Sequence, residues 1–213
     1  MSPSSSTLGK RPETRDRLVE SAAELFSRQG YGATGIKAVL AAAEAPYGSL
    51  YHFFPGGKQE LGAAALAHGG ERYRELLESV YPAGADVVEA TAASFVQAAD
   101  MLEATDYEDA CPIATIALEV ANNDELMRKA AAAAFESWLE VLEERFTTAG
   151  MTPERGREVA VEIFCLIEGA VLLARTTRSS APLHTAGRAA TNAVAAGLAA
   201  GRYDRSGRGH SAS

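Results

Sequence analysis

The segment from Pro46 to Phe54 carries hydroxyl, imidazole and aromatic groups that could contact phosphate oxygens or the edges of bases. If this segment is a helix, Leu50, Phe53 and Phe54 turn inward. The outward face then holds Tyr47, Gly48, Ser49, Tyr51 and His52. A solvated helix face normally carries paired charges, which are absent here, whereas hydroxyl and imidazole groups are typical donors to nucleic acid. Gly48 lowers helix propensity, but it lets a backbone approach a phosphate or a base closely.

Three short helices are expected to position this face. The first begins near Thr14, carries apolar residues at helical spacing and ends at Gly30. The second starts after Thr34 and stops near Ala43, and Pro46 suits the first position of the third. Two helices joined by a tight turn allow one to brace on the DNA backbone while the next enters the major groove. This geometry alone is not specific, because many helical proteins contain such pairs.

The rest of the chain is also expected to be helical, giving an all-α protein of about nine helices. Alanine is abundant, while proline and β-branched residues are sparse, which favours helices. The sequence Pro55-Gly56-Gly57 breaks the chain before Lys58 opens a long helix. Apolar residues at helical spacing predict segments over 58–81, 88–102, 112–123, 126–150, 153–177 and from residue 182 onward.

The net charge of −8 argues against a general nucleic-acid binder, since phosphate neutralisation needs local basic side chains. The charge is unevenly distributed, however. Residues 1–60 hold seven basic and six acidic side chains, a formal +1, so the remainder carries −9. This asymmetry is compatible with a small DNA-facing module attached to an acidic body.

The sequence favours a cytoplasmic protein without a membrane span. No N-terminal stretch combines a basic flank with an apolar run and a cleavage site. The most apolar segment, 159–174, is interrupted by Glu162 and Glu168 and is shorter than the roughly 20 apolar residues that a span requires. Cys111 and Cys165 lie far apart in apolar surroundings without metal-ligand spacing, so we expect buried, reduced thiols.

No catalytic motif is recognisable in the sequence. The four histidines, His52, His68, His184 and His210, form no H-E-x-x-H pattern, and neither a nucleophile elbow nor a phosphate loop occurs. We therefore expect a protein that is not an enzyme and that needs no cofactor or metal.

Several short motifs stand at characteristic spacing around the third predicted helix. They are Tyr31-Gly-Ala-Thr34, the run from Gly48 to Phe54, Gly56-Gly57-Lys58 and Leu61. Together they resemble the N-terminal signature of the TetR family over about residues 14 to 62. Pro46, the break over 54–58, Cys111-Pro112-Ile113-Ala114 and Glu168-Gly169-Ala170 are similar more narrowly to the LmrA/YxaF-like branch of that family.

The resemblance implies a homodimer that places two recognition helices in successive major grooves of a palindromic operator. Such a protein represses transcription until a small molecule binds. The expected organisation is a helix-turn-helix DNA-binding domain over 13–60 and a ligand-binding and dimerisation domain over 61–200. Residues 1–12 and 201–213 are polar, without an apolar pattern, and are expected to be disordered tails. Ligand binding would move the fourth helix and so change the separation of the recognition helices.

The resemblance also implies roles for three residues outside the recognition helix. Thr34 would cap the second helix and donate to a phosphate, and Lys37 would reach the DNA backbone or a base edge. Lys58, with the free N–H groups that start its helix, would hold another phosphate. For Thr34, a plain capping role stays open.

Within the recognition helix the resemblance divides the DNA-facing residues by chemistry. Tyr47 and Ser49 are the candidates for reading bases, and Gly48 permits close approach. Tyr51 and His52 would hydrogen-bond phosphates through their polar tips. For Tyr51, partial packing on the core of the module is the alternative.

Glu44 departs from the family pattern, which usually has glycine in a left-handed conformation at this turn. Glutamate there costs about 1 kcal/mol of backbone strain and places an acid near phosphates. This residue motivates an alternative function, a small-molecule binding protein whose DNA-binding module is weakened or lost.

Six residues of the C-terminal half are candidates for a ligand pocket. They are Phe95, Met101, Ile116, Phe135, Trp138 and Phe164. Core packing is the plainer interpretation of each, because aromatic residues at helical spacing usually build interiors. The resemblance implies a pocket among helices four to eight for an apolar or aromatic molecule. Glu162 or Glu168 would orient that molecule, or would pair with an arginine across a dimer.

The eighth and ninth predicted helices are candidates for the dimer interface. The segment 159–174 is apolar on nearly every side, which a surface helix of a monomer does not sustain without a large exposed patch. The helix that follows Pro182 is rich in alanine and glycine, which permit close helix approach. A purely intramolecular core is the alternative.

Overall fold

The computed structural model describes residues 13–108 and 111–208, which form helices and, within these ranges, no strand. The helices are α1 Thr14–Gln29, α2 Ile36–Ala42, α3 Tyr47–Phe53, α4 Lys58–Val80, α5 Val87–Ala104, α6 Pro112–Val120, α7 Glu125–Ala149, α8 Pro153–Thr177 and α9 Ala181–Arg208. The all-α prediction is therefore confirmed. No helix in the described part of the chain is both long and apolar enough to cross a membrane.

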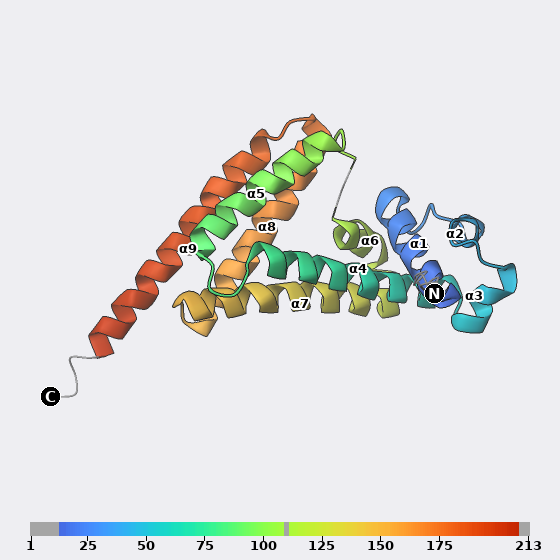
Figure 1. The fold of residues 1–213 in the computed structure, drawn as a ribbon, viewed down its shortest axis with the longest axis horizontal. Helices are drawn as coiled ribbons and strands as arrows, with labels where there is room; N and C mark the ends of the chain where they lie inside the picture. Colours follow the sequence, from blue (N-terminus) through green and yellow to red (C-terminus); the bar gives the residue numbers. More distant parts are fainter. Residues whose placement is uncertain (1–12, 109–110, 209–213) are drawn as a thin grey trace, which may run out of the picture.

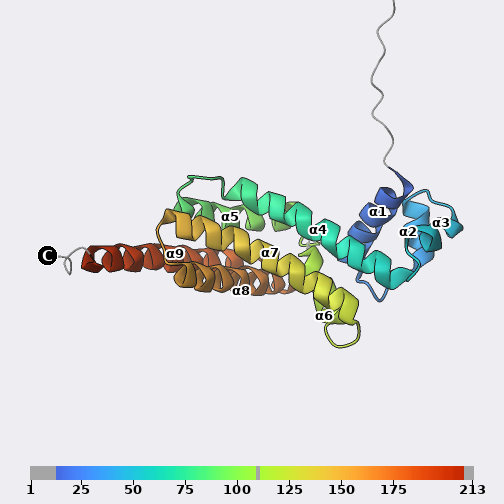
Figure 2. The ribbon, with the colours of Figure 1, turned by 90° about the horizontal axis from the view of Figure 1, so that it is seen from below.

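The helices α1 to α3 form a small module at one end of the molecule (Figure 1). From this module α4 and α7 run side by side into the body, where α5, α8 and α9 pack together (Figures 1 and 2). The short helix α6 lies between the two parts and contacts α1, α4 and α7. Because α4 starts in the module and ends in the body, it joins the two parts mechanically.

Turn and cap residues explain where the helices start and stop. Gly30, at a φ of 84°, ends α1, and Gly150, at 119°, ends α7. The side chains of Asp86, Asp124 and Thr152 cap α5, α7 and α8 by accepting backbone N–H groups. Observed boundaries fall within about two residues of most predicted ones, which is the usual uncertainty of helix ends.

Two predictions about the ends of helices were wrong. Thr34 does not cap α2, because Gly35 occupies the N-cap position and no side chain caps it. The helix α9 continues to Arg208, so residues 201–208 are helical rather than a disordered tail. The predicted tails over 1–12 and 209–213 lie outside the described residues.

Two clusters of buried side chains form the core. The first joins the module to α4, α6 and α7 and contains Phe26, Leu66 and Trp138. The second joins α5, α7, α8 and α9 and contains Phe95 and Phe146. Leu77 and Phe164 pack against both clusters. The module therefore shares a continuous core with half of the body, so movements inside the body can reach it.

Close packing of α4 on α7 generates a first prediction. A methyl group on Gly70 would lie 2.8 Å from Cβ of Ala134, which is attached directly to the α7 backbone. We expect Gly70→Ala to lower the free energy of unfolding by about 1–3 kcal/mol, measured by urea denaturation.

The neighbouring Gly69 provides the control for this prediction. There an added methyl meets only Cδ1 of Ile113 at 3.6 Å, an ordinary contact. Gly69→Ala should therefore raise stability by about 0.5–1 kcal/mol through helix propensity. Equal stabilities of the two variants would contradict the close approach of α4 to α7.

Candidate nucleic-acid interface and interior polar cluster

The outward face of α3 presents aromatic and polar side chains to solvent. Tyr47 and Tyr51 are 62% and 55% exposed, and their ring centroids lie 6.3 Å apart. Gly48 and His52 are exposed and Ser49 is half-buried. The opposite face is anchored by Leu50 and Phe54, which are buried in the core of the module. Five predicted contact residues therefore share one accessible face of a helix with a fixed orientation.

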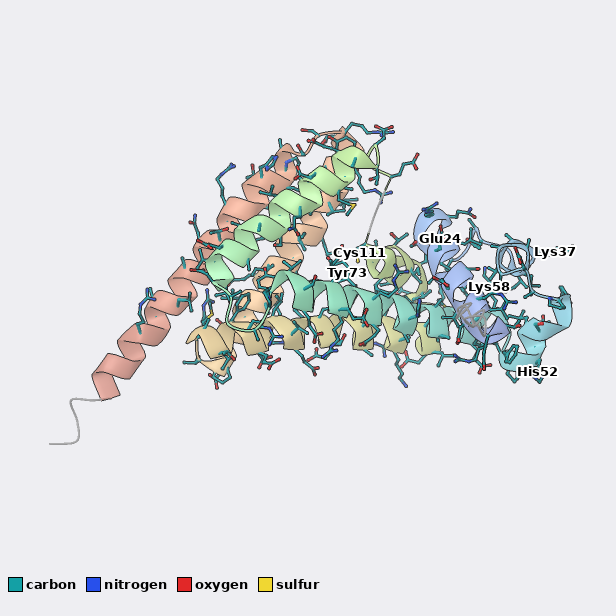
Figure 3. All side chains as sticks on the ribbon, in the orientation of Figure 1. Glu24, Lys37, His52, Lys58, Tyr73 and Cys111 are labelled. Atoms are coloured by element: carbon teal, nitrogen blue, oxygen red, sulfur yellow. The ribbon has the colours of Figure 1, made fainter. Side chains whose placement is uncertain are left out.

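Lys37 extends this surface onto α2. The residue is exposed, and Figure 3 places it at the outer end of the module, as it does His52. Arg15 on α1 lies with its guanidinium carbon 5.5 Å from the centroid of the Phe54 ring, which ties α1 to the end of α3. The module thus carries basic side chains on α1 and α2 in addition to the polar residues of α3.

Thr34 does not belong to this surface. Its side chain is buried, and its hydroxyl donates a hydrogen bond of 2.8 Å to the carbonyl oxygen of Gly30. The predicted donation to a phosphate is therefore incompatible with this conformation. Thr34 instead closes the turn between α1 and α2. In the sequence, a threonine that closes a turn in this way cannot be distinguished from one that caps the following helix or binds a phosphate.

The half-buried Lys58 makes contacts within the protein. Its ammonium donates a 2.7 Å hydrogen bond to the carbonyl oxygen of Tyr31 and lies 4.3 Å from the centroid of the Tyr31 ring. Burial lowers the pKa of Lys58, and the nearby Glu119 carboxylate partly opposes that shift. Lys58 thus fastens the start of α4 to the α1–α2 turn, and its contact with phosphate stays a prediction.

The turn between α2 and α3 has the left-handed residue that the family resemblance implied. Glu44 adopts a φ of 48°, a conformation that costs a residue with a side chain about 1 kcal/mol. Arg17 on α1 supports the same turn by donating from Nε to the carbonyl oxygen of Ala43 at 3.0 Å. The turn is therefore formed despite the absence of glycine.

Glu119 on α6 holds the α1–α2 turn from the side of the body. Its carboxylate accepts the backbone N–H groups of Tyr31 at 3.2 Å and Gly32 at 2.6 Å. A side chain at Gly30 would collide with this carboxylate. Gln59 on α4 adds a second link by donating to the carboxylate of Asp124 at 2.8 Å. Sequence analysis missed these links, because their partners lie far apart along the chain.

The six predicted ligand-contact residues are not gathered in one place. Phe95 belongs to the second core cluster and packs against Gly187 of α9, while Met101 is 59% exposed on α5. Of the remaining four, Phe135 and Phe164 contact the indole of Trp138. Trp138 stacks with Phe164 at a centroid distance of 5.6 Å and makes an edge contact with Phe135 at 5.4 Å.

Ile116 packs in the same cluster as Trp138. The indole N–H of Trp138 donates to the carbonyl oxygen of Gly70 at 2.8 Å, so its one polar atom is satisfied within the protein. A surface hollow that includes Phe95 lies elsewhere, between α5 and α9. Three of the six candidates, Phe135, Trp138 and Phe164, therefore form one aromatic wall, Ile116 belongs to the same core cluster, and Phe95 and Met101 lie apart from it.

Three polar side chains lie together beside this wall: Tyr73 on α4, Cys111 at the start of α6 and Glu168 on α8. Figure 3 shows Tyr73 next to Cys111. Burial, with the Cys111 and Glu168 charges nearby, raises the pKa of Tyr73. Burial also raises the pKa values of the Cys111 thiol and the Glu168 carboxyl, and the thiol partly lowers that of the carboxyl. This interior polar cluster combines hydrogen-bond donors and acceptors next to aromatic rings.

Sequence analysis found only part of this interior polar cluster. Glu168 was a candidate for orienting a ligand and Cys111 was predicted to be buried, whereas Tyr73 was missed. Cys111 is half-buried and Cys165 is exposed on α8, so the prediction of a buried thiol at residue 165 was wrong. Within the described ranges no group of histidine, cysteine, aspartate and glutamate side chains is arranged to hold a metal ion.

The outer side of α8 exposes large apolar residues. Val161, Leu172 and Leu173 are 40%, 66% and 56% exposed, and Cys165 and Gly169 lie between them on the exposed side. Exposed apolar residues in a row along one helix are typical of a surface that another protein covers. The prediction that α8 contributes to a dimer interface remains compatible with the structure.

Sequence comparisons match both parts of the chain to one family. The family "Bacterial regulatory proteins, tetR family" matches residues 18–65, and "Transcriptional regulator LmrA/YxaF-like, C-terminal domain" matches residues 87–189. An uncharacterized HTH-type transcriptional regulator of Mycobacterium tuberculosis is 35% identical over 189 residues, covering 86% of this chain and 95% of the relative.

A second relative and a solved structure agree with these matches. The HTH-type transcriptional regulator LmrA of Bacillus subtilis is 30% identical over 171 residues, which covers 80% of this chain and 91% of LmrA. The crystal structure of regulatory protein TetR from Rhodobacter sphaeroides superposes with a TM-score of 0.72, at 21% identity, over 84% of this chain and 98% of that one. At this identity the structural match supports the fold.

The half-buried carboxyl of Glu168 generates a prediction on pH dependence. Its pKa is raised in the folded chain above the ordinary value of 4.5, so above that pH the folded state holds more protons than the unfolded state. Stability therefore falls as pH rises from 4.5 to the raised pKa. Tyr73 and Cys111 face the carboxyl and stay neutral in this range because their pKa values are raised.

Glu168→Gln removes this titration with little change in shape. The stability of the variant relative to wild type should therefore increase as pH rises from about 4 to about 7, measured by urea denaturation at each pH. Glu162→Gln, at an exposed position of the same helix, is the matched control. Parallel curves for Glu168→Gln and wild type would show that this carboxyl is not buried.

The contact of Glu119 with the α1–α2 turn generates a third prediction. Glu119→Ala removes the acceptor of the Tyr31 and Gly32 N–H groups, so these two amides should exchange hydrogen faster. Stability should fall by roughly 1 kcal/mol, because the lost bonds are charge-assisted but solvent-exposed. Leu118→Ala, at the neighbouring position with 84% exposure, should change neither quantity. Unchanged exchange of both amides in Glu119→Ala would contradict the link.

Proposed function

The chain belongs to the TetR family of DNA-binding transcriptional regulators, and from this premise we propose that it is a homodimeric repressor released from a palindromic operator by a small molecule. The observation that carries the proposal is the outward face of α3, which holds Tyr47, Gly48, Ser49, Tyr51 and His52 on an anchored helix. A helix of this kind, preceded by a tight turn, fits the major groove.

The proposed contacts divide into base reading and backbone positioning. Tyr47 and Ser49 read base edges, and Gly48 lets the helix approach them closely. Tyr51, His52 and Lys37 hold phosphates. Lys58 would also bind a phosphate, either while its ammonium group keeps the hydrogen bond to the Tyr31 carbonyl oxygen or after that bond is broken. The structure revises the role of Thr34, which shapes the turn between α1 and α2.

The proposed dimer forms through α8 and α9. The exposed apolar residues of α8, including Leu172 and Leu173, support this interface, and α9 adds exposed alanines along its outer side. In a dimer with a two-fold axis, the same surface of each subunit would face its copy, so α8 and α9 of both subunits would form a four-helix interface. The two α3 helices would then face half-sites about 34–36 Å apart.

The proposed switch acts through α4 and α6. An effector bound beside Trp138 contacts α7, whose closest partner is α4, and α4 begins at the DNA-binding module. Glu119 joins α6 to the α1–α2 turn of the same module. A ligand that favours a shifted position of these helices changes the distance between the two α3 helices. A change of a few ångströms spoils simultaneous contact with both half-sites.

The rival function is a small-molecule binding protein with a weakened DNA-binding module. The observation that favours it is Glu44, which places an exposed acidic residue in the turn before α3. An acid near phosphates lowers affinity at low ionic strength. Because α2 and α3 are nevertheless formed and Arg17 supports their turn, operator binding is the better supported of the two.

The test is a gel-shift titration with DNA from the region upstream of the gene. Wild type is expected to retard a specific fragment, and Tyr51→Ala, which removes a hydrogen bond to a charged phosphate, is expected to weaken binding by about 1.5–3 kcal/mol. Lys37→Ala should lower the slope of log affinity against log salt by about one per subunit, because one phosphate contact is lost. Lys129→Ala, an equal charge change on α7, should leave both quantities unchanged.

The opposite result would favour the rival function. If wild type retards no upstream fragment at low salt, and Tyr51→Ala behaves like wild type, the DNA-binding proposal fails. If the operator complex forms but an effector bound to the protein leaves its affinity unchanged, the release mechanism fails while DNA binding stands.

A further inference from the structure

The interior polar cluster of Tyr73, Cys111 and Glu168 has the composition of a ligand site. The three side chains come from α4, α6 and α8, and all three are half-buried, so part of each remains accessible. Tyr73 stacks at a tilt on Trp138, with ring centroids 4.4 Å apart, and Trp138 stacks on Phe164. The polar atoms therefore lie beside a continuous wall of three aromatic rings.

Glu168 has no cationic partner among the described residues. The ion pairs of the described chain involve other carboxylates, mostly on exposed helix faces. Arg175, two turns further along α8, donates instead to the carbonyl oxygens of Tyr107 and Glu108. A carboxyl partly removed from water without a cation is costly to the folded protein, and a positively charged ligand would offset that cost.

The aromatic wall favours the same kind of ligand. A cation next to the faces of tyrosine, tryptophan and phenylalanine is attracted by their ring quadrupoles, more strongly when water is excluded. Trp138 is fully buried against Tyr73 and Phe164, and these two half-buried rings provide the accessible aromatic surface. An aromatic ligand would also stack on the wall, so one molecule with a ring and an ammonium group satisfies both features.

Thiol chemistry and metal binding are less consistent with the interior polar cluster. The raised pKa of Cys111 keeps its sulfur in the thiol form, which is a poor nucleophile and a poor metal ligand. The sulfur is already used locally, because it accepts the backbone N–H of Ala114 at 3.4 Å and so caps α6. Cys111 is therefore suited to hydrogen bonding and to positioning the start of α6.

We propose that the effector is a small aromatic amine, whose ammonium group pairs with the Glu168 carboxylate while its ring packs against the half-buried rings of Tyr73 and Phe164. This inference rests on the proposed function in one respect, namely that binding at this site is read out at the operator. The position of Cys111 at the first turn of α6 connects the site to Glu119, which lies at the other end of that helix.

The experiment uses three probes of the same shape that differ in charge: biphenyl-4-yl-methylamine, biphenyl-4-yl-methanol and biphenyl-4-carboxylate. The chain contains one tryptophan, Trp138, so quenching of its fluorescence reports binding at the aromatic wall. Excitation at the red edge of indole absorption avoids exciting biphenyl. We expect the amine to bind at least about tenfold more tightly than the alcohol, and the carboxylate to bind weakest.

Two variants on one helix separate the proposed ion pair from general charge effects. Glu168→Gln should abolish the preference for the amine over the alcohol while the alcohol still binds. Glu162→Gln, which removes an exposed carboxylate paired with Arg155, should keep the preference. Both proteins are checked for folding by circular dichroism and for operator retardation.

The outcomes distinguish this inference from the proposed function. Equal binding of amine and alcohol to wild type, an amine preference that survives in Glu168→Gln, or the absence of quenching by all three probes would each overturn the amine site. If the operator is bound in any of these cases, the proposed function stands alone. If the amine binds through Glu168 but no operator is retarded, the site stands and the proposed function fails.

Discussion

The close pairing of α4 with α7 is the contact on which the rest of the structure depends. These two helices form the most extensive interface between any two helices of the described chain. Gly70 lets their backbones approach, and the buried hydrogen bond from Trp138 to its carbonyl oxygen fixes the register. Because α4 carries the DNA-binding module at its first turn, the position of that module is set by packing deep inside the body.

The short helix α6 is the second connection between the body and the module. Cys111 caps its start beside Tyr73 and Glu168, and Glu119 near its end binds the α1–α2 turn. A helix of nine residues thus spans the distance from the interior polar cluster to the DNA-binding module. Because α4 and α6 both connect the module to the body, we expect a bound ligand to shift the module as a rigid body and not to loosen it locally.

Much of the fold was predictable because the residues that start and end its helices act locally. Gly30 and Gly150 end helices through positive φ values, and prolines stand at or beside the starts of α3, α6 and α8. The exposed face of α3 followed from helical periodicity alone. The extension of α9 to Arg208 was missed, because a helix already formed continues through residues that show no apolar pattern.

The sequence by itself determined the helical class, the helix-turn-helix and the outward face of α3, since each depends on neighbours within a few residues. Only the tertiary structure decided which distant side chains meet. It buried Thr34, drew Lys58 to Tyr31 and separated Phe95 and Met101 from Trp138. It also brought Tyr73 and Glu168 to Cys111. Periodicity gives the face of one helix, but the rotation and offset between helices arise from packing among all of them.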